Sequence, residues 1–410
     1  MSTTEAPRRR LHRHHPRYKW VALSNTTLGM TMATINSSIV LISLPAIFRG
    51  IGLDPLDPAN VSYLLWMLLG FMLVTAALVV TFGRLGDLQG RVRIYNLGFL
   101  VFALSSIALS LVPWEGAAGA EWLIAWRAVQ AVGAAMLMAN STAILTDAFP
   151  VHQRGTALGI NQIAAIAGSF LGLVIGGVLS EWHWRAVFWV SVPFGVAGAI
   201  WSYLSLHEVG QRHKGRLDVP GNVTLALGLG LLLGAVTYGL QPYGSSPMGW
   251  GNPWVVAALL GGVALLVVFV VVESSVPDPM FRLNLFSIPA FSLGNLAGLM
   301  ASISRGGLQF ILIIWLQGIW LPRRGYSYES TPLWASIFLL PLTVGFLVAG
   351  PLCGYLSDRY GARRFAVAGA LVTAGSFLGL MVLPVDFPYW AFALLTFVNG
   401  VGSGMFSSPN

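Results

Sequence analysis

The chain has 410 residues, of which 56% are hydrophobic and only 9% are charged, and its formal net charge is +8. A soluble protein of this length could not cover its surface with so few charged side chains, so lipid is the expected solvent for most of the chain. The single cysteine, Cys353, excludes an internal disulfide and a cysteine-based metal cluster. We expect no metal ion and no cofactor.

The first 19 residues form a basic tail ahead of the first apolar run. Its cationic side chains are Arg8, Arg9, Arg10, Arg13, Arg17 and Lys19. Basic residues beside a membrane span mark the cytoplasmic side and contact anionic lipid headgroups. These roles explain the positive charge of the tail, and no nucleic acid partner is expected. The apolar run that follows is longer than the core of a signal peptide, which is about 7–15 residues, and predicts an uncleaved anchor.

Twelve apolar runs are long enough to cross a bilayer, for which about 20 mostly apolar residues are needed. They cover roughly residues 20–48, 61–82, 94–112, 122–148, 155–180, 186–206, 219–240, 254–272, 290–320, 333–353, 365–384 and 388–410. When the tail is placed inside, most Lys and Arg residues between the runs also fall inside. The sequence therefore predicts an all-α, multi-pass protein of the cell membrane with a cytoplasmic N-terminus.

One polar pattern follows the second apolar run and returns after the tenth. Both copies read G-x-L-x-D-x-x-G-x-x-R and lie in a short polar gap between apolar runs. The first copy contains Gly83, Asp87, Gly90, Arg91 and Arg93, and the second contains Gly354, Asp358, Arg359, Gly361, Arg363 and Arg364. Such a recurrence indicates a duplicated membrane bundle rather than a set of unrelated helices.

The repeated pattern resembles the loop signature of the major facilitator superfamily, which follows the second helix of each half. Further segments are similar to the fourteen-span drug:proton antiporter branch of that superfamily. They are Arg127-x-x-Gln130-x-x-Gly133, Asp147-Ala-Phe149-Pro150 with Arg154, Gly168-x-x-x-Gly172-x-x-x-Gly176-Gly177, and Trp184-Arg185-Ala-Val-Phe188-Trp189. The resemblance implies a monomeric transporter of a small molecule, with protons as a candidate coupling ion.

The place of the repeat within the chain predicts the domain organisation. If each copy follows the second span of its half, residues 20–206 form an N-terminal six-helix half and residues 290–410 a C-terminal half with four of six helices. Residues 219–272 are then an inserted helix pair between cytoplasmic linkers at 207–218 and 273–289. We expect a major facilitator fold with two inserted spans, in a chain that is a piece of a protein with about fourteen spans.

The charged residues of the repeat are expected to form a gate. They lie at cytoplasmic helix ends, where a carboxylate near a helix N-terminus and its arginine neighbours make charge-assisted hydrogen bonds. We assign this gate to both copies of the repeat, together with Asp147 and Arg154 after the fourth span. The alternative is a static loop structure, which the occurrence of the arrangement in both halves disfavours.

Four glycines in the fifth span, Gly168, Gly172, Gly176 and Gly177, are expected to pack helices. Glycines at four-residue spacing form a groove on one helix face that lets a neighbouring backbone approach closely. Direct contact with substrate is the less favoured alternative for these glycines.

Two arginines, Arg127 and Arg305, lie within predicted spans. An arginine at membrane depth is costly unless it faces protein or water, and it is therefore expected to have a function. The resemblance implies that Arg127 organises the central cavity. For Arg305 a helix-packing role and an anion-binding role stay equally open. We assign Asn36, Arg127, Gln130, Arg305 and Gln309 to the substrate cavity.

The first span departs from the antiporter pattern. Asn36 stands where the branch typically has an aspartate, and an amide cannot carry a proton at any ordinary pH. We find no acidic residue deep in a predicted span, and Asp147, at the end of the fourth, is the nearest candidate for coupling. The alternatives are a carboxylate in the two spans expected beyond this chain and a transporter that is not coupled to protons. The two buried arginines would make the cavity positive and favour neutral or anionic substrates. Asn36 is expected to keep this cavity free of negative charge; the alternative is that Asn36 only bridges the first and fourth spans by hydrogen bonding.

Several functions are compatible with these residues. The first is export of small amphipathic compounds, with Trp66, Phe71, Trp315 and Trp320 as adaptable walls. The second is facilitated movement or import of a neutral or anionic metabolite. An enzyme is not expected, because the predicted spans contain no histidine and no nucleophile–base set. The third is a non-transporting membrane sensor or an inactive fragment.

Overall fold

The chain is an all-helical bundle in the computed structural model, which describes residues 17–407 except 56, 211–217, 245, 247, 277–278, 280–282, 328–329 and 385. The tail assigned from sequence lies almost wholly outside the described residues. The first half contains α1 (Tyr18–Gly50), α2 (Val61–Gln89), α3 (Arg91–Ser110), α4 (Gly116–Ala148), α5 (Val151–Trp182), α6 (Ala186–Trp189) and α7 (Ser191–Ser205). The rest contains α8 (Val219–Gly239), α9 (Pro253–Ser275), α10 (Pro289–Trp315), a π-helical turn (Leu316–Trp320), α11 (Leu321–Arg323), α12 (Thr331–Phe338), α13 (Leu340–Tyr360), α14 (Ala362–Val382) and α15 (Tyr389–Ser407).

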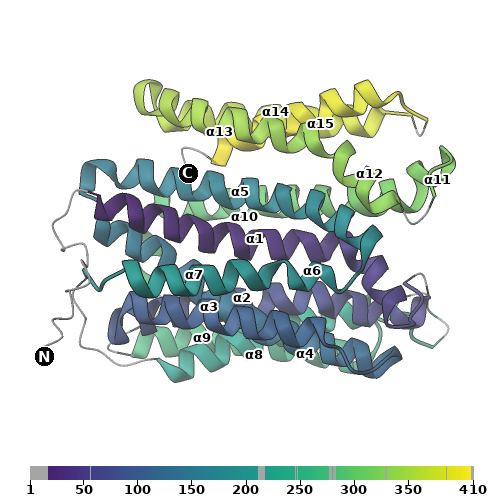
Figure 1. Ribbon diagram of the computed structural model, residues 1–410, viewed down its shortest axis with the longest axis horizontal. Helices are drawn as coiled ribbons and strands as arrows, with labels where there is room; N and C mark the ends of the chain where they lie inside the picture. Colours follow the sequence, from purple (N-terminus) through teal and green to yellow (C-terminus); the bar gives the residue numbers. More distant parts are fainter. Residues whose placement is uncertain are drawn as a thin grey trace, which may run out of the picture.

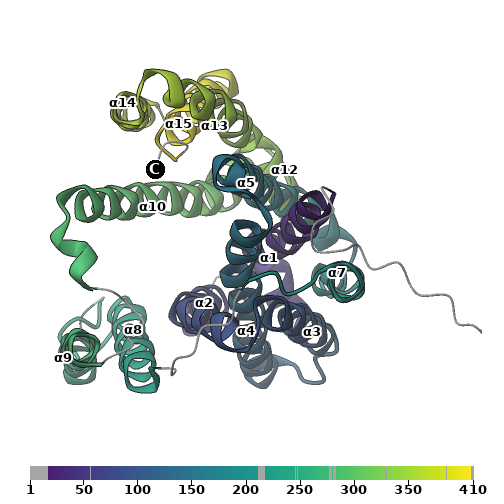
Figure 2. The same cartoon turned by 90° about the vertical axis from the view of Figure 1, so that its left-hand side faces the viewer.

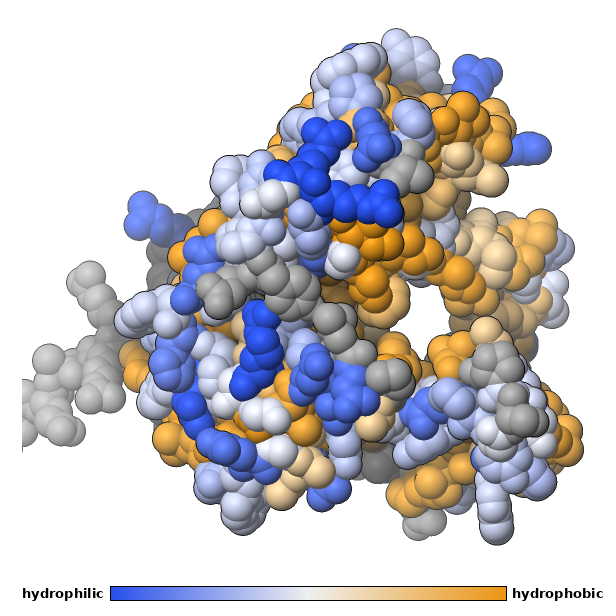
Figure 3. Space-filling model, turned by 90° about the vertical axis from the view of Figure 1, so that its right-hand side faces the viewer, coloured by the Kyte–Doolittle hydropathy of each residue, from blue (hydrophilic) through white to orange (hydrophobic). Residues whose placement is uncertain are grey.

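Twelve helical segments of the described chain are long and apolar enough to cross a membrane, which confirms the predicted number of spans. Most of them run side by side along the long axis of the molecule, with connections at the two ends of the bundle (Figure 1), whereas α10 lies obliquely across it (Figure 2). Seen from the end that carries α11 and α12, hydrophilic residues gather on that face, whereas apolar residues cover much of the flanks (Figure 3). Exposed apolar flanks are what a lipid solvent requires.

The helices form three groups (Figure 2). Within the first group, α1 packs on α5, and α4 packs on α2 and α3. Within the second, α15 packs on α13 and α14 in the way that α4 packs on α2 and α3. The pair α8–α9 lies beside α2, and α10 runs between this pair and the second group. An apolar cluster with Ile42, Leu173, Leu312 and Phe392 joins the first two groups near the α11–α12 end.

The repeated pattern is mostly helical rather than a loop, which corrects the predicted boundary of the second span at residue 82. The helix α2 continues to Gln89 and α13 to Tyr360, so the connection shrinks to one glycine in each copy. Gly90 has φ 119° and Gly361 has φ 94°, a backbone conformation that favours glycine. Each glycine ends one helix and begins the next. We call the end of the bundle that carries them the motif end.

The duplication extends to the packing of the helices that follow. A Cβ atom at Gly133 of α4 would lie 2.9 Å from the carbonyl oxygen of Gly98 on α3. A Cβ atom at Gly402 of α15 would likewise lie 2.9 Å from the carbonyl oxygen of Gly369 on α14. In both groups the two helix backbones therefore touch at a pair of glycines, as close helix packing in membranes requires.

Candidate functional site

A buried hydrogen-bond network surrounds Arg127, which lies about a third of the way along α4. The side chain is 1% exposed, and its Nη1 donates to Oδ1 of Asn36 on α1 and to Oε1 of Gln130, the latter at 2.6 Å. The guanidinium carbon also lies 4.1 Å from the centre of the Phe71 ring on α2, which is a cation–π contact. Both oxygens that accept from Arg127 belong to neutral amides.

The network continues through the amide nitrogens of the two acceptors. Asn36 Nδ2 donates to Ser191 Oγ on α7 at 3.1 Å, and Gln130 Nε2 donates to Ser106 Oγ on α3 at 2.7 Å. These hydrogen bonds and the contact with Phe71 therefore link Arg127, on α4, to helices α1, α2, α3 and α7. In the part of the chain that is described, no carboxylate pairs with its charge. The protein thus keeps a positive group inside the first bundle by solvating it with dipoles and an aromatic face.

A central cavity of about 290 Å³ lies between the first and second groups of helices. Met30 and Thr34 of α1 and Gln162 and Ser169 of α5 line one side. The other side is lined from α10, α13 and α15 by Arg305, Leu308, Gln309, Leu342, Thr343, Phe346, Asn399 and Ser403. The apolar cluster that joins the two groups lies toward the α11–α12 end, so the cavity is closed off from that end.

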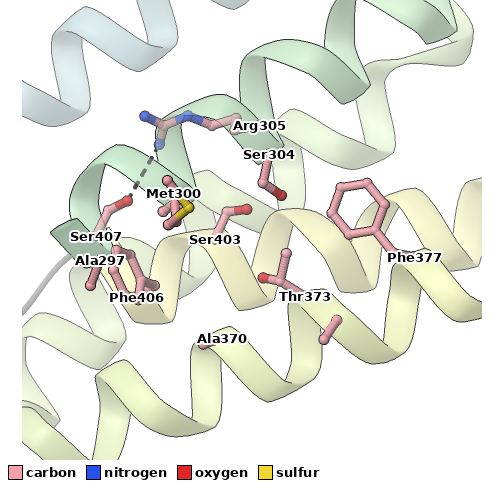
Figure 4. Close-up of a pocket in the computed structure, with 12 residues that line it drawn as sticks. Ala297, Met300, Ser304, Arg305, Ala370, Thr373, Phe377, Ser403, Phe406 and Ser407 are labelled. Atoms are coloured by element: carbon pink, nitrogen blue, oxygen red, sulfur yellow. Dashed lines mark hydrogen bonds between the residues drawn. The ribbon is translucent and has the colours of Figure 1, made fainter.

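The structure separates the residues that were assigned to the substrate cavity. Arg305 and Gln309 line it, as the assignment requires. Asn36, Arg127 and Gln130 instead lie inside the first bundle and do not line it, because they are bonded to one another and are 0–1% exposed. Arg305 also lines a neighbouring cavity of about 360 Å³ between α10, α14 and α15 (Figure 4).

Asn399 and Ser403 are lining residues that we did not assign from the sequence. A signal for Asn399 was present, because Asn399-Gly-Val-Gly402 aligns with Gln130-Ala-Val-Gly133 of the first half. Asn399 and Gln130 make equivalent hydrogen bonds in the structure. Asn399 Nδ2 donates to Ser376 Oγ on α14 at 2.8 Å, and Gln130 Nε2 donates to Ser106 Oγ on α3. Thr396 occupies the place of Arg127 in this alignment, so the aligned position on α15 carries no charge.

Ion pairs at the motif end join α2, α3 and α4. The guanidinium of Arg91 lies 2.8 Å from Oδ1 of Asp87 and 2.7 Å from Oδ1 of Asp147, and it also donates to the carbonyl oxygen of Ala143. The Arg93 backbone N–H donates to Glu208, a residue that we did not assign. Arg154, which we assigned to the same gate, has a different partner: its Nε donates to the carbonyl oxygen of Phe149.

The second copy of the pattern has a different surrounding. Arg363 and Arg364 are exposed, and the guanidinium carbon of Arg359 lies 4.7 Å from the ring centre of Tyr355. The side chain of Asp358 lies outside the described part of the chain. The gating role assigned to the second copy therefore stays a prediction.

The glycines of α5 contact two different partners. A Cβ atom at Gly168 would lie 2.9 Å from the carbonyl oxygen of Thr31 on α1, and one at Gly176 would lie 2.9 Å from that of Ile39. Gly172, which lies between these two glycines on α5, approaches the backbone of α1 in the same way. Gly177 faces the second group, where its Cβ would lie 2.8 Å from the Cα atom of Leu333 on α12. Three of these glycines thus face the first half, and the fourth faces the contact between halves.

Comparison with known proteins decides the family. Residues 26–410 match the Major Facilitator Superfamily, which is more than half of the chain. The chain belongs to this superfamily. It is therefore a multi-pass membrane protein of a transporter family rather than of a family of enzymes.

Several named proteins are similar to this chain in sequence. The riboflavin transporter RibZ of Clostridioides difficile is 28% identical over 96% of this chain and 80% of its own length. The methylenomycin A resistance protein of Streptomyces coelicolor is 28% identical over 94% and 76%, respectively. The cephamycin export protein CmcT of Amycolatopsis lactamdurans is 31% identical over 92% and 74%.

Solved structures confirm the fold. A partially occluded inward-open form of the xylose transporter XylE from E. coli aligns with a TM-score of 0.60 at 16% identity, covering 96% of this chain and 85% of XylE. The peptide transporter POT in complex with sulfate aligns with a TM-score of 0.63 at 18% identity, covering 96% and 81%. The predicted fold class is confirmed by these neighbours and by the helical architecture.

Proposed function

We propose that this protein is a secondary-active exporter of small amphipathic compounds in the cell membrane, working by alternating access. The observation that carries the proposal is the central cavity, which both halves line and which is closed toward the α11–α12 end. Its wall combines apolar side chains with uncharged polar ones and a single arginine, Arg305, a composition that suits partly apolar ligands. Two of the similar proteins are named for antibiotic resistance or export, which supports this direction of transport.

We further propose that the chain belongs to the drug:proton antiporter branch and has the predicted halves and inserted pair. The pair α8–α9 supports this division, because its helices pack mainly on each other and on α2 (Figure 2). The basic tail supports a cytoplasmic N-terminus. The motif end is then cytoplasmic, and the Arg91–Asp87–Asp147 contacts form its gate. Asp147 is the carboxylate of this set that remains a candidate for proton coupling.

A second candidate is movement of a neutral or anionic metabolite without export. The similarity to a riboflavin transporter supports it. The two candidates differ in coupling, because an exporter concentrates its substrate at the expense of an ion gradient. A facilitator only equalises the concentrations on the two sides.

Transport by the purified protein in vesicles would test the proposal. We expect accumulation of a neutral fluorescent amphipath such as N-phenyl-1-naphthylamine against its gradient when a proton gradient is imposed, and none in protein-free vesicles. Ser169→Trp should block this flux, because the indole would fill the cavity wall on α5. Ser24→Trp, at an exposed position of α1, is the matched control. Equal flux without a proton gradient would instead favour the facilitator.

A further inference from the structure

Arg305 is the one charged side chain among the described residues that line the two cavities. It projects from α10, its guanidinium carbon lies 5.8 Å from the ring centre of Phe346, and its Nη1 donates to Ser407 Oγ at 3.3 Å (Figure 4). A guanidinium has five N–H donors. Within the described chain the guanidinium makes this one long hydrogen bond, so most of its donors are open to a ligand.

The two intramembrane arginines therefore have opposite surroundings. Arg127 is enclosed, and its Nη1 is bonded to two amide oxygens. Arg305 is exposed toward a cavity, with a serine as its hydrogen-bond partner. A ligand in the central cavity can reach Arg305 directly, whereas Arg127 is accessible only if the first bundle opens. The accessible positive charge of the cavity is that of Arg305.

The rest of the wall does not neutralise this charge. The described lining residues of both cavities include no carboxylate. In an environment of low dielectric constant, the field of an uncompensated arginine attracts an anion and repels a cation more strongly than it would in water. The wall of the central cavity also contains Gln309, one turn further along α10, and Asn399, whose Nδ2 donates to Ser376 Oγ. Leu308 and Phe346 supply apolar surface for the remainder of a ligand.

We propose that Arg305 binds the acidic group of an amphipathic anion, a carboxylate or sulfonate on an apolar ring body, and so selects anions over cations. This inference rests on the proposed transport function and deepens it. The guanidinium makes charge-assisted and often bidentate hydrogen bonds with such groups, and Phe346 provides an aromatic face beside it. The acidic headgroup of a membrane lipid offers the same chemistry, so the test must distinguish the two sources.

A matched pair of probes can test this inference. 8-Anilinonaphthalene-1-sulfonate and N-phenyl-1-naphthylamine share one aromatic body and differ by the sulfonate. Their binding is measured by energy transfer from the tryptophans of the protein in discs of zwitterionic lipid, with empty discs as the blank. We expect Arg305→Gln to weaken binding of the sulfonate about tenfold or more, because a charge-assisted contact is lost, and to leave the neutral probe unchanged. Arg305→Lys should keep part of the sulfonate affinity.

Arg323→Gln is the control, because it removes the same charge from an exposed residue that lines neither cavity. Equal weakening of both probes, an unchanged sulfonate affinity in Arg305→Gln, or no sulfonate binding by the parent protein would each overturn the inference. Loss of sulfonate binding when anionic lipid is added to the discs would assign Arg305 to lipid. Export of the neutral probe would survive all these results, so they leave the proposed transport function standing.

Discussion

Arg127 is solvated by neutral dipoles, which is an uncommon way to keep a charge inside a membrane protein. Its bonds to Asn36 and Gln130 and its contact with Phe71 replace the carboxylate that would usually balance a buried arginine. Any change in the shape of the first bundle would alter these bonds. Arg127 can therefore couple the arrangement of several helices to one charge without touching the substrate.

Replacing Arg127 by alanine should abolish transport while the protein is still inserted in the membrane. The variant should also be less stable, because two buried amide oxygens lose their donor at a cost of about 1–3 kcal/mol each, partly offset by the removal of a buried charge. Lysine should restore activity only in part, since it lacks the planar fork of donors. Vesicle flux and thermal unfolding in detergent measure both effects, with Arg323→Ala as the control. Normal flux in the alanine variant would exclude this role.

Replacing Asn36 by aspartate should stabilise the protein rather than create a cation site. The new carboxylate would face the guanidinium of Arg127, whereas the lining of the central cavity does not include position 36. We expect a higher unfolding temperature at neutral pH and an unchanged affinity for a lipophilic cation such as tetraphenylphosphonium. In an Arg127→Ala background the same substitution should destabilise the protein, because it then buries an unpaired charge. A gain in cation affinity would place position 36 at the substrate instead.

At the scale of the helices, the two connecting glycines should differ in what they tolerate. Both have positive φ, so alanine at Gly90 or at Gly361 should cost about 1–3 kcal/mol through backbone strain. At Gly90 the added methyl group would also collide with the carboxylate of Glu208, whereas at Gly361 it would meet open space. We therefore expect Gly90→Ala to lower the unfolding temperature more than Gly361→Ala does. Equal losses would mean that the contact with Glu208 is readily relieved.

The number and order of the spanning helices could be predicted because length and hydropathy alone decide them. The helical character of the repeated pattern could not, since Gly83 and Asp87 look like loop residues until the cap at Gly90 is known. The site was only partly predictable for a similar reason. Intramembrane polarity singled out Arg127 and Arg305 alike, but whether a side chain faces a cavity or a neighbouring helix depends on helix rotation. Single-sequence patterns with weak amphipathicity do not specify that rotation.

At the scale of the whole molecule, alternating access requires the contact between the two halves to form and break. In this structure the halves meet near the α11–α12 end, where α5 and α1 contact α12 and an apolar cluster contains residues of both halves. Gly177 lies at this contact, against the backbone of Leu333. Because backbone cannot move aside as a flexible side chain does, any side chain at position 177 must push the halves apart.

Replacing Gly177 by leucine should therefore favour the conformation that is open at the α11–α12 end. Spin labels at the exposed positions Trp182 on α5 and Trp390 on α15, in a Cys353→Ser background, would report the separation of the halves at that end. We expect a longer distance in Gly177→Leu than in the parent, together with slower transport, because closure precedes each turnover. Gly230→Leu is the control, since a Cβ there has only an ordinary contact at 3.9 Å, with Leu73. An unchanged distance distribution would mean that Gly177 merely fills the interface and does not limit its closure.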